Sequence, residues 1–201
     1  MQNILESYLM TQLTQIQAIN SFTCMLVNHN FKNKRNESEM KVIGTGVFIH
    51  ILNRYFLVSA SHVFDDYENL QIPIEKHSSK LMHPGGTTYI NRSDDRDKDF
   101  IDIGFLELDK ASISDILITY KFANEENILL AHRFEHQPYY TFLGYPTTLS
   151  KISQSRNSFH SVPFFHMSTP SNNFQYTKLK RDSTINIITS YDKRKSFLVK
   201  S

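Results

Sequence analysis

The stretch GTGVFIHILNRYFLVSASHVFDD, residues 44–66, decides the fold that we expect for this chain. Gly44 and Gly46 open an apolar run rich in β-branched residues, a turn follows, and a second apolar run begins at Tyr55. Two short apolar runs joined by a turn are typical of a β-hairpin. We interpret the two glycines as bulge or barrel-corner positions in the first strand.

Further short apolar segments follow the same pattern along the chain. They lie at 22–27, 41–50, 55–59, 70–73, 101–108, 139–145, 185–191 and 197–199. Polar stretches at 28–40, 75–87 and 91–99 separate some of them and are predicted to be surface hairpin loops. Many short strands joined by turns predict a mainly β protein, a barrel or a sandwich. Before them, apolar residues at helical spacing over 3–17 predict a short amphipathic helix.

Composition excludes several classes of protein. No apolar run approaches the roughly 20 residues of a membrane span. The first residues lack the basic and apolar regions of a secretory signal. The single cysteine, Cys24, cannot form an internal disulfide and is predicted to be a buried strand thiol. These features indicate a cytoplasmic protein that is not bound to a membrane.

The net charge of +2 is too small to indicate a nucleic-acid partner. Basic residues do gather after Lys178, but they alternate with segments that resemble strands, INIITSY at 185–191 and SFLV at 196–199. Lysines that face solvent or protect a sheet edge explain this pattern better than a polyanion site.

His62 is the first candidate for chemistry. The apolar strand that ends at Ser59 would hold it rigidly, the small residues 59–61 allow a tight turn, and His62 itself is predicted to open one helical turn. A histidine that acts as general base needs one ring nitrogen fixed by an acceptor and the other facing a nucleophile. Asp102, just before the alternating strand IGFLEL, is the acid that we expect to supply the acceptor.

These pieces together resemble the first half of a trypsin-like serine peptidase of the chymotrypsin fold, in its cysteine-poor bacterial intracellular branch. That family reads G-[ST]-G, then L-V-[ST]-A-x-H-V, then D-[IL]-[AG], where this chain has GTGVFI, LVSASHV and DIG. Ser61 stands where alanine is usual. YTFLGYP, 140–146, resembles the first strand of the second barrel. The resemblance covers residues 40–150 and implies that His62 is the general base and Asp102 its orienting acid.

The resemblance also implies a domain organisation. An N-terminal helix over 1–20 would precede a complete first β-barrel over 21–125, which carries His62 and Asp102. Residues 126–201 would form an incomplete second β-barrel. No cofactor is implied, and the partner would be a polypeptide, as substrate or as bound peptide.

The nucleophile of such a peptidase is absent from the sequence. The family places its serine in a Gly-x-Ser-Gly-Gly loop whose amides form the oxyanion hole, yet the last glycine of this chain is Gly144. We therefore assign no nucleophile and expect these 201 residues alone to be inactive. Half a second barrel would also leave strand edges open to a completing protein chain.

Two alternatives remain open at this stage. One is a non-catalytic binding or scaffold protein built on a degenerate peptidase fold and completed by a partner chain. The other is a zinc peptidase, because HRFEH at 132–136 matches H-x-x-E-H. No glutamate follows Glu135 as a third ligand, and Pro138 would end the required helix, so we expect a solvated polar loop there.

Overall fold

The computed structural model describes residues 14–33, 35–75, 80–91, 102–128, 140–153, 158–161, 163–169, 177–178 and 196–198. The chain is mainly β and has a short helix near its N-terminus. That helix is observed over 14–22, so it runs past the predicted boundary at residue 20, and residues 1–13 lie outside the described part. It ends where β1 begins, at a run of buried residues that starts with Thr23 and Cys24.

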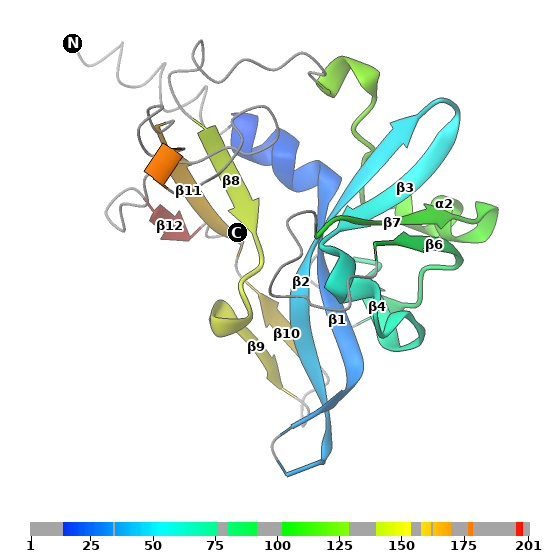
Figure 1. Cartoon of the computed structure of the whole chain (residues 1–201), viewed down its shortest axis with the longest axis vertical. Helices are drawn as coiled ribbons and strands as arrows, with labels where there is room; N and C mark the ends of the chain where they lie inside the picture. Colours follow the sequence, from blue (N-terminus) through cyan, green and yellow to red (C-terminus); the bar gives the residue numbers. More distant parts are fainter. Residues whose placement is uncertain are drawn as a thin grey trace.

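Seven antiparallel strands form the principal sheet (Figure 1). They are β1 (Thr23–Lys32), β2 (Ser38–Ile51), β3 (Arg54–Ser59), β4 (Leu70–Pro73), β5 (Leu81–Met82), β6 (Gly86–Ile90) and β7 (Gly104–Leu108). Their order is β5-β4-β1-β2-β3-β7-β6. The part β4-β1-β2-β3 is a Greek key, because β1 to β3 are joined by hairpins and β4 returns beside β1.

The sheet is curled like half a barrel, and its two ends are not joined in the residues described. β5 and β6 are the edge strands. Pro84 lies in the short segment of chain that links β5 to β6, and a proline has no N–H to donate to a sheet. A complete first barrel, as expected from the sequence, is therefore not observed in the described ranges.

Of the two glycines expected at a bulge or barrel corner, Gly44 borders a bulge, whereas Gly46 pairs regularly with Cys24. Leu26 pairs with Gly44 and Val27 with Val42, so Ile43 is the extra residue of a β-bulge. Gly46 lies deep in the core: a Cβ there would lie 2.5 Å from Leu57 Cδ1. Only a residue without a side chain allows β2 and β3 to pack in this way.

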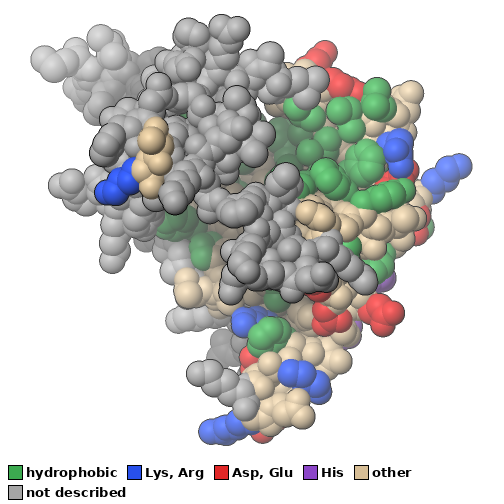
Figure 2. All heavy atoms as spheres, viewed as in Figure 1, with side chains coloured by type: hydrophobic (Ala, Val, Ile, Leu, Met, Phe, Trp, Pro, Cys, Tyr) green, Lys and Arg blue, Asp and Glu red, His purple; other side chains and the backbone are tan. Residues whose placement is uncertain are grey.

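The alternation predicted for β7 separates a buried face from an outer face, and β3 pairs with it. Leu57 pairs with Leu106, and both are fully buried. On the outer face Phe105 pairs with Tyr89 of β6, and these side chains are 42% and 49% exposed. Figure 2 shows apolar side chains gathered over this part of the sheet.

Two stretches predicted as loops contain strands. In 28–40, β1 continues to Lys32 and β2 begins at Ser38, and the Lys41 ammonium lies 3.7 Å from the centre of the Phe31 ring. This cation–π contact joins the two strands of the polar hairpin across an irregularity in their pairing. In 75–87, β5 and the start of β6 are strands. The loop prediction was wrong there because β5 is only two residues long and β6 begins with a glycine and two threonines.

Two helical turns connect β3 to β4, and a helix and a further turn come after β7 in the sequence. They are the 3-10 turns η1 (Ser61–Phe64), η2 (Tyr67–Asn69) and η4 (Glu125–Asn127), and the helix α2 (Lys110–Ile116). Among the helices that the structure describes, none has the length and apolar character that a membrane crossing requires.

A second group of strands lies on the other side of the β1–β2 hairpin (Figure 1). It comprises β8 (Tyr140–Gly144), the turn η6 (Thr147–Leu149), β9 (Ser150–Ser153), β10 (Ser158–Ser161), β11 (Phe164–Ser168) and β12 (Ser196–Leu198). β12, β11 and β8 form one sheet, and β10 and β9 form another. The predicted strand at 185–191 lies outside the described residues.

Candidate functional site

The turn η1 carries His62 away from the end of β3. Ser61, Val63 and Phe64 are buried, whereas His62 is exposed. The Val63 amide donates to the Ala60 carbonyl at 3.1 Å, which closes the turn. Because its neighbours are fixed in the core, His62 projects from a rigid base, as the sequence predicts for this position.

Asp102 holds His62 at two points. One carboxylate oxygen, Oδ2, lies 2.5 Å from His62 Nδ1, and the other, Oδ1, accepts the backbone N–H of His62 at 3.0 Å. Forty residues of sequence separate the pair, and the structure brings them together. The two contacts fix both the position of the carboxylate and the plane of the imidazole ring.

This arrangement sets the protonation of the neutral imidazole. An ionised carboxylate only accepts hydrogen bonds, so the proton of the neutral ring resides on Nδ1. Nε2 then carries the lone pair, and no described residue forms a hydrogen bond with it. An imidazole in this state can take a proton from a hydroxyl group placed at Nε2.

The pair is open to solvent. The side chains of His62 and Asp102 are 56% and 35% exposed. Ion pairs this accessible add little to the stability of a fold, because water screens them and holding the side chains costs entropy. Their geometry is therefore better explained by orientation of the ring than by stabilisation of the sheet.

Two contacts beside the pair were not foreseen from the sequence. Gly104, at the start of β7, lies under the turn: a Cβ there would lie 2.7 Å from Phe64 Cδ2 and 3.0 Å from Ser61 Cα. The Ser61 hydroxyl donates to the Asn91 carbonyl at 2.9 Å. The glycine in DIG was a visible signal for close packing, but nothing in one sequence links Ser61 to a residue 30 positions away.

The zinc site suggested by the H-x-x-E-H match has no support in the described residues. HRFEH at 132–136 lies outside them. Within the described ranges no group of three or more histidine, cysteine, aspartate or glutamate side chains could hold a metal ion. Cys24 is fully buried on β1, as the sequence predicts.

Comparisons of the chain with protein-family models, curated proteins and solved structures found no match. The functional argument therefore rests on the geometry around His62.

Proposed function

We propose that this chain is the histidine- and aspartate-bearing part of a trypsin-like serine peptidase with a chymotrypsin-like fold. The observation that carries the proposal is the double contact of Asp102 with the Nδ1 and backbone amide of His62. The Greek-key order of the curled sheet and the G-T-G, S-A-S-H and D-I-G segments support it. The G-T-G segment lies in β2, S-A-S-H spans the end of β3 and the start of η1, and D-I-G leads into β7.

In the proposed reaction His62 Nε2 removes the proton of a serine hydroxyl while the serine oxygen attacks a peptide carbonyl. The same nitrogen then gives the proton to the leaving amine, and an acyl-enzyme remains until water hydrolyses it. Asp102 stabilises the imidazolium that forms in between. The substrate is a polypeptide, and the single buried cysteine fits a cytosolic setting.

The serine of this triad would come from outside the 201 residues, because they contain no Gly-x-Ser-Gly-Gly segment. Without nucleophile and oxyanion hole the pair has nothing to activate. The 201-residue chain by itself should therefore hydrolyse peptides at a negligible rate.

A second candidate is a non-catalytic peptide-binding protein completed by another chain. The observation that favours it is the edge position of β8, which pairs only with β11 in the described part of the chain. Phe142 on this strand is 44% exposed. A partner strand could add to this edge through backbone hydrogen bonds.

A fluorophosphonate probe, which labels only activated serines, tests the proposal. The isolated 201-residue chain should not react. The native product, captured from its source cells with an antibody to the principal sheet, should be labelled, and His62→Gln in the chromosomal gene should abolish the labelling. His29→Gln is the matched control, because His29 is also exposed and its Nδ1 also contacts an oxygen, that of Asn69.

Labelling of a serine within the 201 residues would contradict the proposal that the nucleophile comes from outside them. Labelling that survives His62→Gln, or a native product that is never labelled, would contradict the peptidase proposal. A native product that is never labelled but co-purifies with one protein in stoichiometric amount would favour the second candidate.

A further inference from the structure

The ends of three strands meet beneath the His62 turn. Ser59, the last residue of β3, pairs with Gly104, the first residue of β7. Gly104 pairs on its other side with Ile90, the last residue of β6. The turn η1 leaves β3 at this row of strand ends and contacts both β7 and β6.

Gly104 allows the turn to lie directly on β7. The space that a side chain would need there is taken by the Phe64 ring and by the backbone at Ser61. The turn therefore crosses β7 without an intervening side chain and reaches the end of β6.

Ser61 anchors the turn at the end of β6 through a hydrogen bond. Its side chain is fully buried, and its hydroxyl donates to the carbonyl of Asn91, the residue that follows β6. The next residue, His62, is fastened to Asp102, which precedes β7 by two positions. Consecutive residues of one turn are thus hydrogen-bonded to Asn91, just after β6, and to Asp102, just before β7.

We propose that Ser61 is a positioning residue for His62. Its hydroxyl prevents the turn from rotating about the contact with Asp102, and so keeps the imidazole in line with the carboxylate. The significance of this role for catalysis rests on the proposed function, but the role itself is a property of the turn and can be measured without catalysis.

The proton on His62 Nδ1 provides the test. In protein carrying ¹⁵N-histidine, the hydrogen bond to Asp102 should place this proton far downfield and slow its exchange with water. Ser61→Ala should move the resonance upfield and accelerate exchange roughly fivefold, the factor that corresponds to the loss of about 1 kcal/mol from an ordinary hydrogen bond. The amide signals of Leu57 and Leu106 should stay in place, which would show that the core is intact.

Ser59→Ala is the matched control. The Ser59 hydroxyl also donates to a backbone carbonyl, that of Thr45, at 3.0 Å, and it lies two residues from Ser61. This variant should leave the His62 proton unchanged. If Ser61→Ala does not fold, Ser61→Cys replaces the hydroxyl with a larger side-chain group that is a weaker donor, and an intermediate shift is expected. An unchanged proton in the folded Ser61 variant would overturn the proposal.

The probe experiment separates this inference from the proposed function. If the native product is labelled, Ser61→Ala should slow labelling several-fold and Ser59→Ala should not. If the wild-type product is not labelled, the peptidase proposal fails, and the nuclear magnetic resonance result still decides the role of Ser61.

Discussion

At the scale of the residue, Gly104 sets the distance between the His62 turn and β7. The neighbouring atoms that would meet a Cβ belong to a fully buried ring and to the backbone at Ser61, and neither can move away without shifting the turn. A side chain at position 104 would therefore displace the turn that carries His62 toward Asp102.

Gly104→Ala should lower the free energy of unfolding by about 1–3 kcal/mol, the usual cost of forcing a methyl group into a packed interior. Urea denaturation of the purified chain measures it. Gly44→Ala is the control, because its new Cβ would meet only the Val63 side chain at 3.2 Å and the Ser59 hydroxyl at 3.9 Å. Equal losses for the two variants would show that the packing under the turn is not special.

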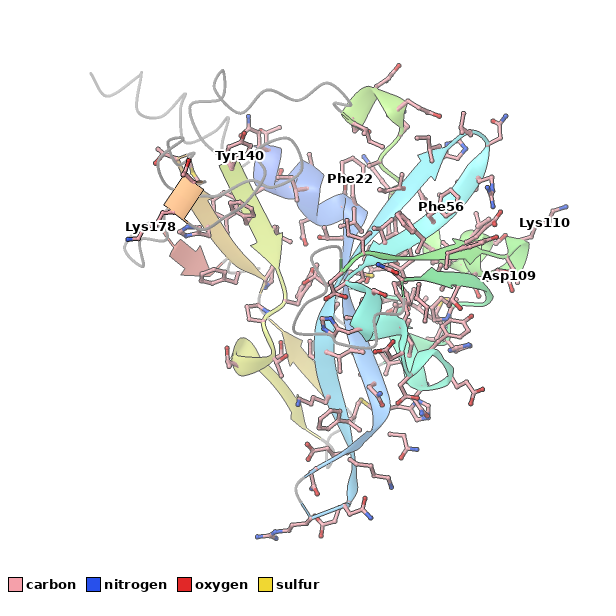
Figure 3. All side chains as sticks on the ribbon, in the orientation of Figure 1. Phe22, Phe56, Asp109, Lys110, Tyr140 and Lys178 are labelled. Carbon is pink, nitrogen blue, oxygen red and sulfur yellow. The ribbon has the colours of Figure 1, made fainter. Side chains whose placement is uncertain are left out.

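At the scale of the element, helix α2 depends on its N-cap. The Asp109 side chain accepts the Ser112 amide at 2.8 Å, and this hydrogen bond lowers the pKa of the Asp109 carboxyl below its ordinary value of 3.8. Figure 3 shows Asp109 and Lys110 at the start of the helix. Because the pKa is lowered on folding, the carboxylate stabilises the fold above pH 3.8.

Asp109→Ala should therefore cost about 1 kcal/mol of stability at neutral pH. The difference from wild type should shrink as the pH falls below 3.8 through the lower pKa of the folded protein, because the wild-type carboxyl then also becomes neutral. Thermal unfolding at a series of pH values measures it, with Asp115→Ala, an exposed carboxylate in the same helix, as control. A cost that does not change with pH would argue against the cap as its source.

At the scale of the whole molecule, the segment after β8 attaches the second group of strands to the principal sheet. The Tyr145 amide donates to Thr45 Oγ1 at 2.7 Å, and Thr147 Oγ1 donates to the Val42 carbonyl at 3.0 Å. The Tyr145 hydroxyl donates to Asn20 Oδ1, and burial raises the pKa of this phenol. The segment after β8 thus contacts both the helix and the bulged part of β2.

Local pattern was enough to predict the β2–β3 hairpin, the turn at His62 and the candidate partner Asp102, because apolar alternation and small residues leave few other conformations. It failed for β5, which is only two residues long, and for β6, which begins with a glycine and two threonines; both segments pair as strands with β4 and β7. Contacts such as Thr45 with Tyr145, a hundred residues apart, depend on tertiary packing that one sequence does not encode in any visible pattern.

The most direct measurement of the central claim is the protonation of the neutral His62 ring, read from the ¹⁵N shifts of its two nitrogens. We expect the proton on Nδ1 in the wild-type chain. In Asp102→Asn it should move to Nε2, because an amide group can donate to Nδ1 and a carboxylate cannot. A wild-type ring protonated on Nε2, or one that Asp102→Asn leaves unchanged, would contradict the assignment of His62 as a base oriented by Asp102.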